Sequence, residues 1–242
     1  MAHFYLLETL ESTTVGSTIV LDGAEGRHAA TVSRVRAGER FSLGNGRGLV
    51  VAAEVLSTSK DTVELRVDSV EEMKPETPQI YLVQALAKTD RDERAVEAAT
   101  ELGIDVVIPW AADRSISKWE GPKIDKGRSR WSAIVREATK QSIRAFLPRV
   151  GPHLKTAQLI SELEDAHIIV LDPTGTVPLS RVELDERDIA VVVGPEGGIT
   201  EAELARFSEA GASTVTLGSN ILRTSTAGPA ALAIINAKLG RC

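Results

Sequence analysis

The feature that most constrains the fold is a buried strand that ends at a glycine-rich corner. Residues Ile189–Val193 form an apolar, mostly β-branched run, which is typical of a strand buried on both faces. The corner at residues 194–198 follows, and Thr200 with Glu203 forms a capping box that predicts a helix start. Such a corner brings bare backbone groups to the carboxyl edge of a sheet, where open α/β sheets bind ligands. The alternative is an ordinary tight turn.

Two further strand ends carry small-residue loops. The apolar run 168–171 is followed by a loop at 172–175, and the run 215–217 by a loop at 218–223 and a helix start. Three strand ends of this kind can line one pocket. The chain contains no Gly-Lys-Ser/Thr tripeptide and no glycine cluster with dinucleotide spacing, so the pattern argues against a nucleotide polyphosphate.

The composition is that of a soluble globular protein. The chain has 242 residues, 43% hydrophobic and 26% charged, which allows one domain or two. No apolar stretch is long enough to cross a bilayer, and the first residues do not resemble a signal peptide, so we expect a cytoplasmic protein with no membrane partner. The single cysteine, Cys242, excludes an internal disulfide framework, and no Cys/His cluster has zinc-ligand spacing, so we expect no metal. A net charge of −6 argues against a generic nucleic-acid binder but permits a local basic patch.

The pattern of elements predicts two domains. Short strands with a hairpin signal at Asn45-Gly46 suggest a small barrel over residues 1–73, with strands near 4–7, 17–21, 40–43, 49–53 and 62–67 and a helix near 25–32. A polar linker with two prolines separates it from a second domain over residues 79–242. There the alternation of strands 80–85 and 106–109 with the helix 92–102, capped by Gly103, predicts an α/β fold with a parallel sheet.

Two more helices are predicted in this second domain. One covers 129–146, with Trp131 and Ala138 on its buried stripe and Arg130, Gln141 and Arg144 on a polar one. The other covers 228–239 and is apolar nearly all round, which predicts burial, and its alanines allow close approach of a second helix. The basic residues of both domains are either solvated surface or contacts to RNA phosphates. The uncharged Gln141 and Ser142 among them favour RNA contacts.

The corner at 194–198, together with the segment Leu217–Thr224, resembles the SPOUT-class RNA methyltransferases. Within that class the chain resembles the family that methylates N3 of a uridine in bacterial small-subunit (16S) ribosomal RNA. The resemblance covers nearly the whole chain. It implies an N-terminal PUA-like β-barrel, a C-terminal α/β SPOUT domain with a trefoil knot, S-adenosyl-L-methionine as cofactor, and a homodimer. It implies 16S rRNA or the small ribosomal subunit as partner.

The resemblance also implies the site residues. Arg223 is the catalytic candidate because it is the only cation in the pocket loops, where it would stabilise an anionic uracil; the alternative is a loop-stabilising arginine. The cofactor candidates are Leu171, Pro173, Gly194, Glu196, Gly197, Leu217, Gly218, Ile221, Leu222 and Thr224. The RNA-binding candidates are Arg27, His28, Arg34, Arg36, Lys88, Arg114, Ser115, Arg130, Gln141, Ser142 and Arg144. Thr89 stands where the family usually has glycine, and Ser225 where it has glutamate.

Two other functions remain open at this point. One is a knotted methyltransferase with another RNA target, such as a ribose 2′-OH. The other is a non-catalytic RNA-binding factor in ribosome assembly that keeps the fold without the cofactor.

Overall fold

The computed structural model describes residues 4–241, which form two compact units. The first unit comprises the chain up to Pro75 together with Thr139–Leu147, and the second comprises Glu76–Ala138 and the chain from Pro148 onward. Cys242 and the first three residues, part of the segment compared with a signal peptide, lie outside the described range.

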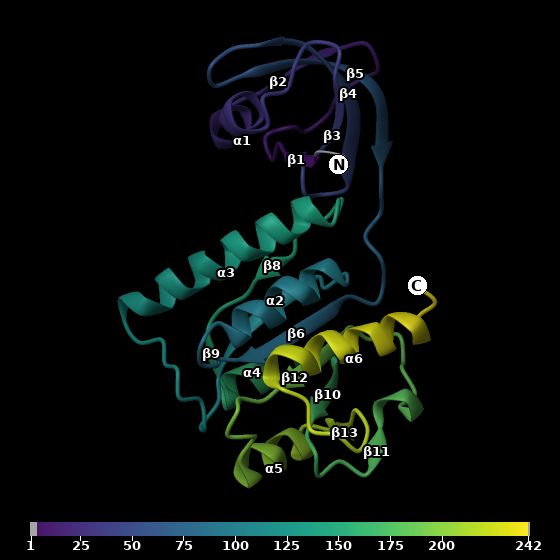
Figure 1. Cartoon of the computed structure of the whole chain (residues 1–242). Coiled ribbons are helices and arrows are strands. Elements are labelled where there is room, and N and C mark those ends of the chain that lie inside the picture. The colour runs from purple at the N-terminus through teal and green to yellow at the C-terminus, as the bar shows by residue number, and fades with distance from the viewer. Residues whose placement is uncertain (1–3, 242) are drawn as a thin grey trace. The chain divides into compact units, whose positions relative to one another are not determined.

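The first unit is built on a five-stranded sheet (Figure 1). Its strands are β1 (Phe4–Leu6), β2 (Thr18–Leu21), β3 (Arg40–Gly44), β4 (Leu49–Thr58) and β5 (Val63–Glu72), in the order β1-β3-β4-β5-β2. All neighbours are antiparallel except β1 and β3. Alternate residues of β4, from Leu49 to Val55, point into a core of Leu, Val and Phe side chains. The five predicted strands and the hairpin at Asn45 are therefore confirmed.

The helix predicted near residues 25–32 is present and longer than expected. Helix α1 (Gly23–Arg27) continues directly into a π-helical segment, His28–Ser33. It ends at Arg34, whose φ of 54° is left-handed. Ala29 is fully buried on the inner side of this segment, while Arg27 and His28 are exposed.

A segment distant in sequence completes the first unit. Lys140 Nζ lies 3.1 Å from Glu25 Oε1, and both side chains are only 10% exposed. The backbone N–H of Gly48 donates to Ala145 O at 3.1 Å, and that of Leu147 donates to Gly46 O at 2.9 Å. The sequence prediction placed residues 139–147 in the second domain, because the linker at 73–78 was the clearest visible break. The contacts above place this segment in the first unit instead.

We expect Glu25→Ala to lower the free energy of unfolding of the first unit by about 3 kcal/mol, since it leaves the Lys140 ammonium buried without its carboxylate. Hydrogen exchange of peptides from β4 and β5 under mild denaturant measures this loss. Asp61→Ala is the matched control: it breaks the Arg27–Asp61 pair, whose side chains are 69% and 48% exposed, and should cost at most about 1 kcal/mol. Equal losses in the two variants would contradict the assignment of a buried pair.

The second unit is built on a parallel sheet. Its main strands are β6 (Ile80–Ala85), β7 (Val106–Ala111), β10 (His167–Leu171), β12 (Ile189–Val193) and β13 (Ser213–Thr216). The order is β11-β13-β10-β12-β6-β7-β8, with β9 also paired to β7; the short strands are β8 (Arg149–Val150), β9 (Leu154–Lys155) and β11 (Val177–Pro178). Every pairing is parallel, as the βαβ pattern predicted.

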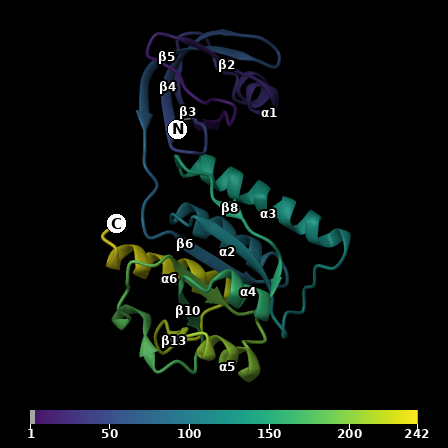
Figure 2. The ribbon, with the colours of Figure 1, turned by 180° about the vertical axis from the view of Figure 1, so that it is seen from behind.

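Helices cover both faces of this sheet (Figures 1 and 2). Helices α2 (Arg91–Glu101) and α6 (Thr224–Lys238) pack on one face, and α4 (Thr156–Glu162) and α5 (Glu201–Glu209) on the other. Alternating residues of one strand serve the two layers. Val192 packs in the cluster with Phe207 of α5, whereas Val193 faces Gly228 of α6. The three predicted strands with their loops, β10, β12 and β13, thus lie side by side in one sheet that is covered on both faces.

The predicted bounds of two helices, α3 and α2, need correction. Helix α3 covers Pro122–Gln141 rather than 129–146: Pro122 suits the first helical position, and Ile143, with a φ of 56°, lies beyond its end. Arg144 therefore lies outside the helix on which it was placed. Leu102 follows the last residue of α2 and is 37% exposed, so it is not part of that helix's buried face.

The C-terminal helix α6 is buried on one side only in a single chain. Ala231, Leu232 and Ile235 are fully buried, whereas Ala233 and Ala237 are exposed. The expectation that the whole helix is buried is thus wrong for the isolated chain, and a face of small side chains stays open.

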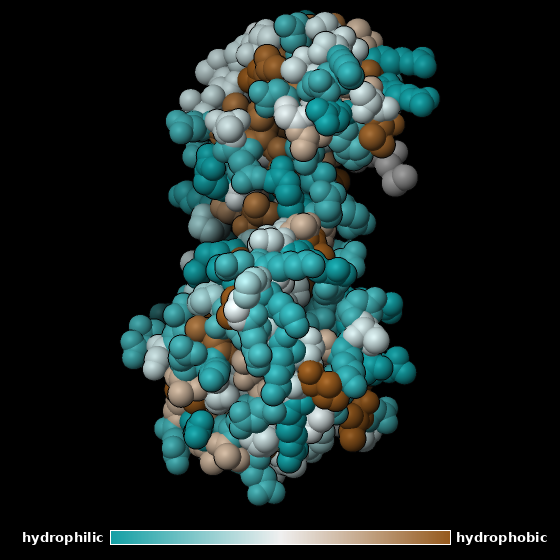
Figure 3. Space-filling view, turned by 90° about the vertical axis from the view of Figure 1, so that its left-hand side faces the viewer, coloured by the Kyte–Doolittle hydropathy of each residue, from teal (hydrophilic) through white to brown (hydrophobic). Residues whose placement is uncertain are grey.

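The surface is predominantly hydrophilic, with hydrophobic residues in scattered patches on the face in Figure 3. Among the described residues no helix is both long and apolar enough to cross a membrane. Among the described residues, Ile221, in one of the predicted pocket loops, is the most exposed large hydrophobic residue, at 81%.

Candidate functional site

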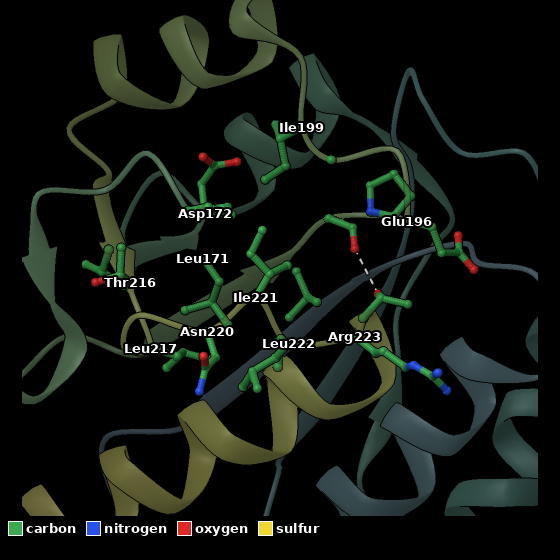
Figure 4. Close-up of a pocket in the computed structure, with 18 of the residues that line it drawn as sticks. Leu171, Asp172, Glu196, Ile199, Thr216, Leu217, Asn220, Ile221, Leu222 and Arg223 are labelled. Atoms are coloured by element: carbon green, nitrogen blue, oxygen red, sulfur yellow. Dashed lines mark hydrogen bonds between the residues drawn. The ribbon is translucent and has the colours of Figure 1, made fainter.

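A pocket of about 500 Å³ lies at the carboxyl ends of β10, β12 and β13, where the three predicted loops meet (Figure 4). Leu171 and Asp172 come from the first strand end, Val193 and Gly194 from the second, and the segment 215–224 from the third. The parallel pairing of Leu171 with Val193 on one side and Val215 on the other sets the three strand ends level. The lining is completed by Arg91, Pro173, Pro195, Glu196, Gly198, Ile199 and Ala227.

Thr224, at the end of the third loop, bonds to the corner after β12 and to strand β6. Its hydroxyl donates to Gly194 O at 2.8 Å, the bond drawn in Figure 4, and accepts from Gln84 Nε2, also at 2.8 Å. Thr224 and Gln84 are both buried, so these bonds are shielded from water. The start of α6 is thereby fixed against the corner after β12.

The loop after β12 is held by charged and backbone groups. Glu196 Oε1 accepts from the backbone N–H of Lys88 at 3.1 Å and from Arg91 Nη1 at 3.2 Å. Arg114 Nη1 donates to Gly197 O at 3.1 Å. A Cβ at Gly194 would lie 2.7 Å from Ile199 Cγ1, so the corner packs too closely for a larger residue there.

The capping box of α5 is part of a larger buried network. Glu203 is 1% exposed, and its Oε2 accepts from the backbone N–H and hydroxyl of Thr200 at 3.0 and 2.8 Å. Its Oε1 accepts from the backbone N–H of Asp113 at 2.9 Å and from the hydroxyl of Thr156 at 3.0 Å. The predicted cap is confirmed, and its carboxylate also joins α5 to the segments after β7 and β9.

We expect Glu203→Ala to lower the free energy of unfolding by about 3 kcal/mol or more, because it leaves several buried donors without an acceptor. Denaturant unfolding followed by the fluorescence of Trp110, which donates to Thr156, reports on this region. Glu209→Ala, at the exposed end of the same helix, is the control and should change stability by less than about 0.5 kcal/mol. A near-neutral Glu203→Ala would show that the network contributes little.

Nine of the ten cofactor candidates line the pocket, and Gly197 does not. A Cβ at Gly197 would lie 3.1 Å from the Cβ of Arg114, so this glycine packs against that arginine instead. In Figure 4, Leu171, Ile221 and Leu222 gather at the centre of the pocket. Ile221 is solvent-exposed at this centre, which leaves an apolar side chain for a ligand to cover.

The catalytic candidate Arg223 lies at the edge of the pocket. Its side chain is exposed and extends away from the apolar centre in Figure 4. No side-chain hydrogen bond or ion pair is formed between Arg223 and the residues 4–241, so the alternative role of bracing loop carbonyls has no bond to support it. Arg223 is the only cation in the three pocket loops, as expected, but a second cation, Arg91 of α2, also lines the pocket and is paired with Glu196.

Four RNA-binding candidates lie in the second unit. Lys88 is exposed and Arg114 braces the glycine-rich corner through its carbonyls. Ser115 is only 5% exposed. Arg130 is exposed and paired with Glu93 of α2, and this hydrogen bond raises the pKa of the guanidinium. The structure therefore gives two of these four residues a role in holding the second unit together.

The other seven candidates all lie in the first unit. Arg27, His28, Arg34 and Arg36 are exposed on the helix 23–33 and the turn after it. Gln141, Ser142 and Arg144 lie on the added segment 139–147, which the Lys140–Glu25 pair joins to the same helix. Residues about 110 positions apart in the chain are thus brought into one unit.

The sequence reading missed two charged residues that line the pocket, Asp172 and Arg91. Asp172 is 8% exposed, and its Oδ1 accepts from the backbone N–H and hydroxyl of Thr174 at 2.9 and 2.7 Å. Its position directly after a buried strand was the available signal. Arg91 was not among the candidates, because its place in the pocket depends on the bond to Glu196, which follows the neighbouring strand β12.

Comparison with known proteins agrees with this architecture. The family model for an RNA methyltransferase domain matches residues 74–236, and that for an RNA methyltransferase PUA domain matches residues 21–68. The chain belongs to this family of RNA methyltransferases.

Two curated relatives and one solved structure carry the same name. The ribosomal RNA small subunit methyltransferase E of Mycobacterium tuberculosis is 38% identical over 100% of this chain and 94% of its own, and that of Bacillus subtilis is 31% identical over 98% and 96%. Among solved structures, the enzyme of that name from Neisseria gonorrhoeae bound to S-adenosyl methionine has a TM-score of 0.88 at 30% identity over 98% of both chains. A putative methyltransferase from Legionella pneumophila with the same cofactor has a TM-score of 0.88 at 28% identity over 98% of both chains.

Proposed function

We propose that this protein uses S-adenosyl-L-methionine to methylate N3 of a uridine in 16S ribosomal RNA. The observation that carries the proposal is the pocket at the ends of β10, β12 and β13, in a chain that is similar over its full length to small-subunit rRNA methyltransferases. The Neisseria relative, with the same fold, binds S-adenosyl methionine.

The residues of the pocket fit this cofactor. Leu171, Ile221 and Leu222 supply apolar surface for an adenine ring. Bare backbone at Gly194, Leu217 and Gly218 can exchange hydrogen bonds with its edge, and the carboxylates of Asp172 and Glu196 can accept from ribose hydroxyls or an ammonium group. The volume of about 500 Å³ lies in the range of small-molecule sites.

When bound, S-adenosyl-L-methionine supplies a methyl group on a sulfonium, which a nucleophile displaces in line. The loops hold the reacting groups in that alignment, and this positioning alone is worth several kcal/mol of the barrier. Uracil N3 must lose its proton before it attacks, and the negative charge then spreads over the neighbouring carbonyl oxygens. Arg223 is the exposed cation at the pocket edge that can stabilise this anion.

We expect Arg223→Ala to keep the affinity for S-adenosyl-L-methionine within about threefold but to lower the methylation rate by about a hundredfold, as the loss of one charge-stabilising group does. Calorimetry measures the affinity, and single-turnover transfer of labelled methyl to small subunits from a deletion strain measures the rate. Arg181→Ala, an exposed arginine outside the pocket, is the control and should match the wild type. Wild-type turnover by Arg223→Ala would refute the catalytic role.

The target atom is tested on rRNA from strains with and without the gene. Methylation at N3 blocks Watson–Crick pairing, so primer extension should stop at one uridine in the parent and read through it in the deletion strain. Mass spectrometry of the nucleosides should show the loss of 3-methyluridine. Loss of a 2′-O-methyl nucleoside instead would favour the ribose methyltransferase, and unchanged rRNA with no cofactor binding would favour the assembly factor.

We further infer that the chain is knotted and that its first unit is a PUA-like barrel, which the match of the RNA methyltransferase PUA domain to residues 21–68 supports. The strand β13 lies beyond β10 in the sheet, yet the helix α6 that follows β13 returns to pack on β12 and α2. A chain that passes through the loops of the site would follow this path.

The exposed alanine face of α6, with Ala233 and Ala237, supports a homodimer, since small side chains let two helices approach closely.

A further inference from the structure

A second pocket of about 480 Å³ lies in the same unit, around the segment that follows β7. Its lining includes the buried apolar residues Leu86 and Ala112, together with Ser115, Trp119 and His153. None of these residues lines the first pocket. Its volume is within the range of small-molecule sites, so it is large enough for a nucleotide-sized group.

Two buried polar atoms of this pocket lack a partner. Ser115 is 5% exposed, and its Oγ forms no hydrogen bond within the described chain. Neither does the buried Nε2 of His153. Burial lowers the pKa of His153, so its imidazole is neutral at neutral pH and can donate or accept. An unmade buried hydrogen bond is costly, so these atoms point to a ligand that supplies the missing partners.

The aromatic wall is built into the fold. Trp119 packs so closely on Gly127 of α3 that a Cβ there would lie 2.4 Å from its ring. The ring lies 5.2 Å from that of Trp131 and 5.5 Å from that of His153, measured between centroids. A planar apolar group entering the pocket therefore meets rings that are already held in place.

Arg114 and Glu203 connect the lining of the second pocket to the corner beside the first. Asp113 and Ser115 line the second pocket, and Arg114 between them donates to the carbonyls of Gly197 and Ile199 beside the first. Glu203 also binds the backbone N–H of Asp113 and the hydroxyl of Thr156, another lining residue. The segment that lines the second pocket is thus bonded to the glycine-rich corner beside the first.

The charges at the rim favour an anionic ligand by a small margin. Lys118, Lys155 and Arg206 are exposed lining residues, against the carboxylates of Asp113 and Glu120. A phosphate can bind the cations while the interior takes an uncharged base. Apolar walls, aromatic rings and hydrogen-bonding atoms of both kinds are the features that recognise unpaired RNA bases.

We propose that this second pocket binds an unpaired nucleotide of the RNA substrate, near the nucleotide that is methylated. Its base hydrogen-bonds Ser115 Oγ and His153 Nε2 beside Trp119, and its phosphate contacts Lys118. The proposal rests on the proposed function for the identity of the RNA, and it assigns to the second pocket the task of holding the substrate while the first performs the transfer.

The kinetic test uses Ser115→Ala and, as an independent surface variant, Lys118→Ala. Each should raise KM for small subunits from a deletion strain by about tenfold, with kcat and the affinity for S-adenosyl-L-methionine unchanged, because loss of one such contact costs about 1–2 kcal/mol. Lys123→Ala is the matched control: it removes the same charge five residues away, outside the pocket, and should leave KM near the wild-type value. Equal effects of the two lysine variants, a wild-type KM in both pocket variants, or a parallel loss of cofactor affinity in Ser115→Ala would overturn the proposal.

A direct test locates the RNA. Small-subunit RNA containing 4-thiouridine is irradiated with the wild-type protein, and crosslinked peptides are mapped by mass spectrometry. Crosslinks to Trp119 or His153 support the second pocket. If the wild type methylates this RNA but crosslinks only outside the pocket, the pocket assignment fails while the proposed function stands; if it transfers no methyl group to any RNA, the proposed function fails separately.

Discussion

The hydroxyl of Thr224 holds together the elements on which the first pocket depends. It bonds at once to the buried Gln84 of β6 and to the carbonyl of Gly194 after β12, and so fixes the start of α6 between two strands. The segment 217–223, which forms one wall of the pocket, is suspended between this point and β13. Without the bonds of Thr224, only the turns within the segment would fix its conformation, since Ile221 is exposed and packs little against the rest of the unit.

Much of the fold was predictable because its signals are local. Buried strands such as Ile189–Val193 are continuous apolar runs, and the cap formed by Thr200 and Glu203 is a four-residue pattern. The pocket followed from the same logic, because parallel strands end at one edge of a sheet and three of them carried small-residue loops. The expectations of a knot and of a particular target base had no such local signal and came from resemblance alone.

What the sequence could not predict depends on partners far along the chain. Arg91 enters the pocket because it pairs with Glu196, more than a hundred residues away, and Gly197 leaves it because Arg114 packs against it. The end of α3 was missed for a related reason: Ile143 adopts a left-handed conformation, which a β-branched residue takes only when surrounding contacts impose it. Periodicity within one segment contains none of this information.

The segment 139–147 has a consequence for how the first unit comes into being. Glu25 pairs with Lys140, and the backbone at Gly46 and Gly48 bonds to Leu147 and Ala145, so the first unit lacks these partners until the ribosome has synthesised about three-fifths of the chain. A fragment cut at the proline-containing linker would lack these partners and expose a buried carboxylate. Anyone who wishes to isolate the N-terminal unit must graft the nine residues 139–147 back onto it, for example through a short loop, rather than truncate the gene at the linker.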